Sequence, residues 1–314
     1  MKATSSIAVT LLLTLLGIRS TAADDWPMWR HDAGRGAAPS VTLPGKLTLK
    51  WKLALPKPVP AWPEEQGKVR FDASYNVIAI NRRIIVPSMV GGHVTAYDTT
   101  NGERVWRFYA NGPVRFAAAA CRDTGAVVVG SDDGYLYCLD AQQGTLKWKM
   151  RGGPDDRKVL GNDRLISMWP IRGAPVVADR TVYFAAGIWP FMGIFIHAVD
   201  IETGEVQWTN SGTGSDYIVQ QHNSPAFAGV APQGYLTVVD DTLLVSGGMT
   251  VPAALDRATG QLRYFRPGDR VLGKDPGGYE VIGYSDWFVN HGGLYQLSDG
   301  TPLEELQVRA AGND

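Results

Sequence analysis

The chain has 314 residues, with 30 Lys and Arg against 31 Asp and Glu and a formal net charge of −1. No basic block stands out, so the charge gives no support to a nucleic-acid partner. The 36 glycines and 10 tryptophans favour glycine-rich turns between short aromatic strands. This composition predicts an all-β fold.

The first 23 residues have the layout of a cleavable secretory signal peptide. Lys2 precedes an apolar run at residues 7–18, and small residues lead up to Ala23, before the polar Asp24. The run is too short to span a bilayer, and a buried N-terminal helix is the alternative interpretation. We therefore expect an exported chain, periplasmic or secreted, whose mature part has no transmembrane segment.

A repeat fills most of the mature chain, with copies at residues 94–106, 136–148, 196–208 and 252–264. Each copy has a small residue, then an aspartate, a glycine four positions later and an aromatic residue four positions after that. In chain order the repeated positions are Ala96, Asp98, Gly102 and Trp106; Cys138, Asp140, Gly144 and Trp148; Ala198, Asp200, Gly204 and Trp208; and Ala254, Asp256, Gly260 and Tyr264. A weaker fifth copy ends at Gly300, and residues 49–52 look like one more outer strand ahead of the first copy.

The chemistry of the repeat predicts a β-propeller. The aspartate accepts backbone N–H bonds and the glycine adopts a positive φ, so together they reverse the chain tightly. The small residue fits a crowded strand, and the aromatic residue can pack on a neighbouring blade. The copies recur roughly every 40–60 residues, about the length of one four-stranded antiparallel blade with insertions.

Residues 127–140, followed by Gly144 and Trp148, closely resemble the pyrroloquinoline-quinone (PQQ) type repeat with its tryptophan docking motif. Residues 26–32 also resemble the start of such exported propellers. The resemblance covers roughly residues 25–300 and implies one propeller domain over residues 24–314. It implies seven or eight blades, whereas five to six are recognisable here. The ring is therefore small or irregular, or the chain is a version truncated at its C-terminus.

The repeat also addresses the two cysteines. Cys138 occupies the small-residue position of its copy, and Cys121 lies on an earlier strand with one strand between them. Non-adjacent strands lie about 9–10 Å apart. A disulfide spans at most about 7 Å between Cα atoms. We predict that the two thiols are not paired.

Two insertions, residues 151–172 and 211–233, carry the candidate binding residues, which are Arg164, Trp169, Arg172, His222 and Asn223. The arginines suit a carboxylate of a quinone, a tryptophan suits a flat ring and a histidine suits a base or ligand. Trp189 is an alternative stacking residue. The competing interpretations are a loop ion pair of Asp163 with Arg164, a structural His222, a solvated charge run at residues 155–158 and a loop core at residues 189–191.

Known cofactor motifs are missing from the sequence. Quinoprotein dehydrogenases with this repeat usually carry an adjacent cysteine pair, and many carry a Cys-x-x-Cys-His haem site; neither occurs here. His31, His93, His197 and His291 show no metal-ligand spacing. The resemblance therefore transfers no catalytic residue, although PQQ and calcium stay open as cofactors.

Three functions follow from these observations. The first is an exported non-catalytic propeller that binds other periplasmic or outer-membrane proteins as a scaffold. The second is a quinoprotein oxidoreductase that uses PQQ and calcium. The third is a carbohydrate- or peptide-binding propeller with an aromatic-rich surface.

Overall fold

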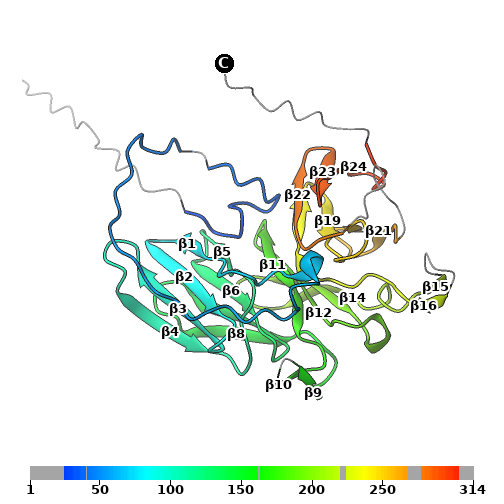
Figure 1. Ribbon diagram of the computed structural model, residues 1–314, viewed down its shortest axis with the longest axis horizontal. Coiled ribbons are helices and arrows are strands. Elements are labelled where there is room, and N and C mark those ends of the chain that lie inside the picture. The colour runs from blue at the N-terminus through cyan, green and yellow to red at the C-terminus, as the bar shows by residue number, and fades with distance from the viewer. Residues whose placement is uncertain (1–24, 40, 162, 220–223, 268–276, 304–314) are drawn as a thin grey trace, which may run out of the picture.

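The computed structural model describes residues 25–39, 41–161, 163–219, 224–267 and 277–303. The predicted signal peptide and two candidate residues, His222 and Asn223, lie outside them. The fold is all-β and consists mainly of four-stranded antiparallel sheets, as predicted. Figure 1 shows these sheets side by side around an arc, from β1–β4 on the left to β22–β24 at the upper right.

Five blades are present among the described residues. The first two are β1–β4 (Ile78–Ile80, Arg83–Ser88, His93–Asp98, Arg104–Tyr109) and β5–β8 (Ala119–Cys121, Ala126–Gly130, Tyr135–Asp140, Leu146–Arg151). The third is β11–β14 (Ile171–Ala178, Thr181–Ala186, Phe195–Asp200, Val206–Asn210), joined by β17 (Gly234–Tyr235). The fourth is β18–β21 (Thr237–Val239, Thr242–Val245, Ala253–Asp256, Leu262–Tyr264), and the fifth is β22–β24 (Val281–Tyr284, Trp287–Asn290, Gly293–Gln296).

Each repeat joins one blade to the next. In the second copy, Gly144 has a φ of +70° and donates its N–H to the Asp140 carbonyl oxygen. The Trp106 ring of the preceding blade covers Gly144 so closely that a Cβ would overlap it, and its Nε1 donates to the Ala141 carbonyl oxygen at 3.0 Å. The same contact joins Trp148 to Gly204, Trp208 to Gly260 and Tyr264 to Gly300. The weak fifth copy thus docks as the other copies do.

The segment ahead of the first copy departs from the prediction. Residues 49–52 form no strand, because no strand within the described parts of the chain lies beside them to pair with. Trp51 nevertheless docks like the other aromatics. Its ring covers Gly102, and its Nε1 donates to the Thr99 carbonyl oxygen at 3.0 Å.

The cysteine prediction is confirmed. Cys121 lies on β5 and Cys138 on β7, with β6 paired between them. Both thiols are buried and unpaired. Burial raises the pKa of Cys138 to about 12, so its thiol is an inert part of the core.

Residues 26–36, which we call the N-terminal plug, cross the first strands of all five blades (dark blue in Figure 1). Trp26 pairs with Ala79 on β1, Pro27 accepts from Ala120 on β5, the Met28 sulfur lies at the Val177 amide on β11, Ala33 accepts from Val238 on β18, and Gly34 accepts from Gly283 on β22. The plug therefore connects blades that are far apart in the sequence.

Arg35 anchors the plug and is fully buried. Its guanidinium donates to the carbonyl oxygens of Trp29, Pro175 and Leu236. The Trp29 ring stacks on Tyr235 at 4.0 Å, and Arg35 lies over both rings. Burial lowers the pKa of Arg35 to about 10, so the side chain stays charged at neutral pH.

Candidate functional site

A buried charge network lies among the first three blades and the segment before β1. We call it the mouth cluster; it consists of Asp72, Arg115, Asp132 and Arg172. Arg115 precedes β5, Asp132 lies in the turn between β6 and β7, and Arg172 is on β11. Each side chain is at most 3% exposed.

The cluster forms a continuous chain of ion pairs. Arg115 donates from Nη1 to Asp72 Oδ2 at 2.6 Å and from Nε to Asp132 Oδ2 at 2.6 Å. Arg172 donates from Nη1 to the other oxygen of Asp132. Burial raises the pKa of Asp72 against the opposing effect of Arg115, and burial lowers the pKa of Arg172. Two cations and two anions neutralise one another here, so the cluster buries no net charge.

Residues 59–72, which we call the cap, close over this cluster. The Ala61 amide donates to Asp72, and Arg115 Nη1 donates to the Val59 carbonyl oxygen at 2.9 Å. Farther along, Trp62 Nε1 donates to Gln233 at 3.3 Å, which ties the cap to the segment before the fourth blade. The cap includes the short helix η1 (Gly67–Val69).

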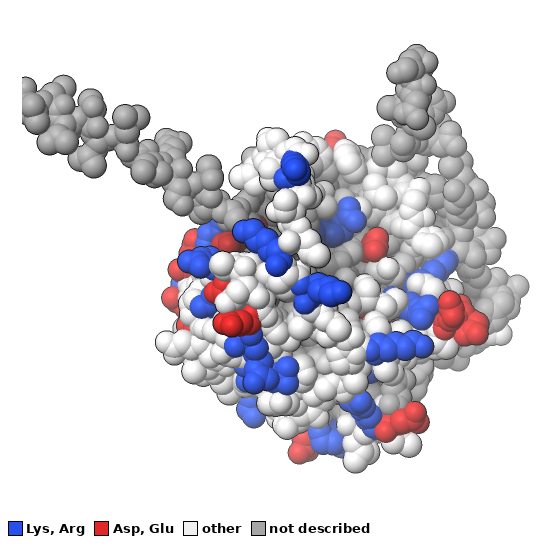
Figure 2. All heavy atoms as spheres, turned by 60° about the vertical axis from the view of Figure 1, so that its left-hand side comes forward, with Lys and Arg blue, Asp and Glu red and all other residues white. Residues whose placement is uncertain are grey.

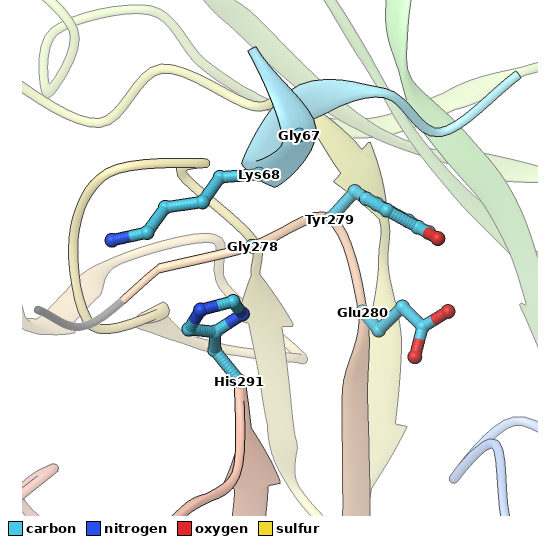
Figure 3. A pocket seen from close by; sticks show the side chains of 6 residues that line it. All are labelled: Gly67, Lys68, Gly278, Tyr279, Glu280 and His291. Carbon is cyan, nitrogen blue, oxygen red and sulfur yellow. The ribbon is translucent and has the colours of Figure 1, made fainter. Parts of the chain in front are cut away.

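A cavity of about 260 Å³ lies between η1 and the fifth blade and is lined by Gly67, Lys68, Gly278, Tyr279, Glu280 and His291. Figure 3 shows Lys68 and His291 on one side, with Tyr279 and Glu280 pointing the other way. The side chains thus do not converge on one point. A second cavity of similar size lies between Gly91–Gly92 and Arg164.

The structure separates the candidate binding residues. Arg164 is exposed on the hairpin of β9 (Lys158–Gly161) and β10 (Arg164–Ser167), whereas Arg172 is buried in the mouth cluster. Trp169 is also buried; its Nε1 donates to the Met192 carbonyl oxygen at 2.8 Å, and the Arg157 guanidinium lies 4.9 Å from its ring centroid.

As placed, Trp169 and Arg172 do not fit PQQ. A flat anionic cofactor needs an open ring face and a guanidinium fork without a partner. The Trp169 ring lies under Arg157, and Arg172 is paired with Asp132. Within the described ranges, no three His, Cys, Asp or Glu side chains group as a metal site. We derive no chemical step through either cofactor.

The structure also places the charge run at residues 155–158 and the aromatic loop at residues 189–191. Asp155 and Arg157 form an exposed ion pair at 2.9 Å, as expected for a solvated charge run. The predicted loop core at residues 189–191 is wrong, because Trp189 is 48% and Phe191 62% exposed. Their ring centroids lie 6.4 Å apart in a stacked arrangement, with Phe191 on the short helix η2 (Pro190–Met192) and Trp189 at its N-cap.

Sequence reasoning missed three members of the mouth cluster, Asp72, Arg115 and Asp132. They are separated by tens of residues, and a single sequence gives no signal that brings them together. The turn at residues 131–134 lies within the stretch that resembles the PQQ-type repeat, but the role of Asp132 depends on Arg115 and Arg172, which lie outside the turn.

Comparisons with known proteins agree with the repeat. The family model described as outer membrane protein assembly factor BamB matches residues 90–269. The BamB of Yersinia pestis is 26% identical over 162 residues, which are 49% of this chain and 39% of that protein. The dehydrogenase subunit of the quinone alcohol dehydrogenase of Gluconacetobacter polyoxogenes is 32% identical over 123 residues, or 36% of this chain and 16% of that protein.

Solved structures show the fold of this chain. A europium-containing methanol dehydrogenase superposes with a TM-score of 0.58 at 16% identity, covering 89% of this chain and 57% of that one. At this identity the likeness concerns the fold alone. The chain spans less than half the length of the curated relatives it matches.

Proposed function

Because the chain belongs to the PQQ-type propeller family described as outer membrane protein assembly factor BamB, we propose that it is an exported, non-catalytic propeller serving as a protein-binding scaffold. Its relative in Yersinia pestis carries the name of an assembly factor, which supports protein partners rather than a small-molecule substrate. We further propose partners among periplasmic or outer-membrane proteins.

One observation carries the non-catalytic part of this proposal. The guanidiniums of the mouth cluster are paired with Asp72 and Asp132, and the cap lies over them. Opening this site to a ligand would expose the paired buried charges. A ligand that displaced one carboxylate from its guanidinium would leave that carboxylate buried without a cation. Breaking such pairs costs about 3–5 kcal/mol.

The proposed location rests on the first 23 residues, which we propose are removed as a signal peptide. No helix among the described residues is long and apolar enough to cross a membrane. Mass spectrometry of the protein from a periplasmic fraction should give a mature N-terminus at Asp24. A chain that keeps residues 1–23 would contradict export by cleavage.

The test of the non-catalytic role is a titration of the folded protein with PQQ, with and without calcium, followed by tryptophan fluorescence. We expect no saturable quenching. Because the exposed Trp189 would respond to loose adsorption, Trp189→Phe is the matched control and removes that background. Saturable, calcium-dependent quenching that persists in Trp189→Phe would overturn the proposal.

The second candidate is a quinoprotein oxidoreductase, which the 32% identity to a quinone alcohol dehydrogenase subunit favours. Arg164 is exposed beside a cavity and is the candidate guanidinium that lies outside the mouth cluster. If PQQ binds in the titration, Arg164→Lys should weaken its binding, because lysine cannot reproduce the planar fork.

A further inference from the structure

Four exposed aromatic side chains lie at the third blade, and we call them the aromatic surface; they are Trp189, Phe191, Tyr217 and Phe227. The first two belong to the loop that contains η2. The other two face each other on the hairpin of β15 (Tyr217–Val219) and β16 (Pro225–Phe227), with ring centroids 5.1 Å apart. Each side chain is between 48% and 62% exposed. Exposed aromatic side chains that gather in one place indicate a binding surface.

The two aromatic pairs belong to one surface, because the loop and the hairpin are in contact. Ser215, two residues before Tyr217, donates from Oγ to the Pro190 carbonyl oxygen at 3.1 Å. Gly214 lies so close to Ile194 that a Cβ would overlap it. The third blade that carries both segments packs against the second and fourth blades through β11. The aromatic surface is thus held within the continuous part of the arc.

The cap shows what kind of segment packs beside this surface. Residues 55–60 read Leu-Pro-Lys-Pro-Val-Pro, so each residue is a proline or precedes one. Such a sequence favours the extended polyproline II backbone. Two residues farther on, Trp62 lies edge-to-face against Trp189, with ring centroids 6.1 Å apart. The chain therefore already places the end of a proline-rich segment against Trp189, and it leaves 48% of that residue exposed.

Carboxylates border the aromatic surface on two sides. Glu65 is exposed in the cap, three residues after Trp62, and Asp216 is exposed just before β15. Glu64 is also in the cap, where Arg70 pairs with it at 3.7 Å. Figure 2 shows Lys and Arg side chains spread over the side that is brought forward, where β1–β4 lie. A basic partner should therefore be repelled from that side and attracted to the border of the aromatic surface.

We propose that the aromatic surface binds a proline-rich segment of a partner protein, in the polyproline II conformation and with Lys or Arg among its prolines. This inference rests on the proposed role as a protein-binding scaffold and names the kind of segment that is bound. Such a helix docks on exposed aromatic rings and loses little conformational entropy, because it is already formed. Its basic side chains face Glu65 and Asp216, and the Tyr217 hydroxyl can donate to one of its carbonyl oxygens.

A labelled peptide of three Pro-Pro-Lys repeats is a suitable probe. Polyproline II has three residues per turn, so the lysines lie along one edge and the prolines along the others. We expect saturable binding to the purified chain by fluorescence anisotropy. A peptide of three Gly-Ser-Lys repeats has the same charge but no preformed helix, and it should bind about tenfold more weakly. Equal binding of the two peptides would show that charge alone attracts the probe and would overturn the proposal.

The protein variants Tyr217→Ala and Phe191→Ala should each weaken binding by about tenfold, since aromatic side chains supply much of the binding energy of an interface. Tyr284→Ala is the matched control. Tyr284 is a similarly exposed tyrosine on β22 whose ring contacts a second aromatic ring, that of Trp287, and this variant should bind as the wild type does. No binding of the probe, binding that neither variant weakens, or an equal loss in Tyr284→Ala would each overturn the proposal.

Two other occupants of the aromatic surface are tested in the same way. Cellohexaose should not displace the peptide; displacement by this oligosaccharide would overturn the proposal and assign the surface to a glycan. Sedimentation of the protein alone should show a monomer. A dimer that Tyr217→Ala dissociates would overturn the proposal and assign the surface to self-association.

The peptide experiment and the PQQ titration fail independently. A chain that binds neither the peptide nor PQQ loses this surface as its binding site, while the scaffold role itself stands. Saturable, calcium-dependent PQQ binding contradicts the non-catalytic role, whatever the peptide does.

Discussion

Two five-residue stretches of this chain have nearly the same sequence and different structures. Residues 49–53 read Leu-Lys-Trp-Lys-Leu, and residues 146–150 on β8 read Leu-Lys-Trp-Lys-Met. Both tryptophans donate Nε1 to a backbone carbonyl oxygen at 3.0 Å in the following blade. Among the described residues, only the β8 stretch has a paired strand, on which Cys138 of β7 faces Trp148.

The difference shows what a docking tryptophan does alone. It holds a segment on the next blade, but it does not make the segment a strand, since β structure requires a neighbour to accept and donate backbone hydrogen bonds. Burial follows the same division: Leu146 is 46% exposed, whereas its counterpart Leu49 is 83% exposed. β propensity thus describes how a side chain fits a sheet that is already present.

Trp148→Ala should have the largest effect. The residue is paired within its blade and docked on the next, so its loss should lower the free energy of unfolding by about 3 kcal/mol. Urea unfolding followed by circular dichroism measures this change. A loss below about 1 kcal/mol would mean that the paired strand does not depend on its docking residue.

Acid should destabilise the blades at His197, which is buried on β13 and bonded to Gly152 and Thr209. Burial lowers the pKa of His197 to about 4, while the unfolded chain keeps a value of about 6.5. As the pH falls from 6.5 to 4, the unfolded state binds a proton that the folded state does not bind. Stability should therefore decrease by up to about 3 kcal/mol.

The measurement is the urea midpoint across this pH range for the wild type and His197→Gln. The variant should keep the carboxylate contributions and lose the histidine one, so its midpoint should change less. Equal pH dependence in the two proteins would contradict the prediction. Amide exchange in residues 47–55, corrected for its intrinsic pH dependence, should not follow this titration.

The two docked glycines should respond unequally to a methyl group. Gly102 and Gly144 have φ values of +73° and +70°, where alanine is strained by about 1–2 kcal/mol. In Gly144→Ala the added Cβ also meets Trp106, which a paired strand holds in place, so we expect a total of about 2–3 kcal/mol. In Gly102→Ala the segment that carries Trp51 can move away, because no strand among the described residues pairs with it, so only the backbone strain remains. Equal losses in the two variants would indicate that Trp51 is as firmly held as Trp106.

Trp51→Ala should have the smallest effect, with a loss of about 1 kcal/mol or less in the free energy of unfolding, because no strand among the described residues is paired with residues 47–55. Hydrogen exchange should become faster at Gly102 and its neighbours and stay unchanged in β8. A loss as large as that of Trp148→Ala would show that the two stretches are equivalent in the folded protein.

The sequence predicts the blades well because their determinants are local. Asp140, Gly144 and Trp148 lie within nine positions, and each position has a physical requirement that few residue types meet. The same locality explains the error at residues 49–52. The pattern of a fourth strand is present in residues 49–52. Such a segment becomes a strand only when a third strand from elsewhere in the sequence pairs with it.

The candidate site is predicted poorly because its determinants are not local. The planar fork of Arg172 predicts an anion ligand, but the role of Arg172 depends on Asp132. The surroundings of Trp169 depend in the same way on Arg157 and Met192. The pairs form only when blades and cap come together. Composition, spacing and repeats carry no information about such contacts.

The N-terminal plug has a consequence for the order of folding. Residues 26–36 leave the ribosome early, yet Gly34 bonds Gly283, and Arg35 bonds Leu236. Arg30, His31, Arg35 and Ala37 all hold positive φ values, which an isolated chain does not favour. Residues 26–36 must therefore wait for the fourth and fifth blades before they reach their place. Such long-range closure is slow, and it makes docking of the plug a late step in the folding of these five blades.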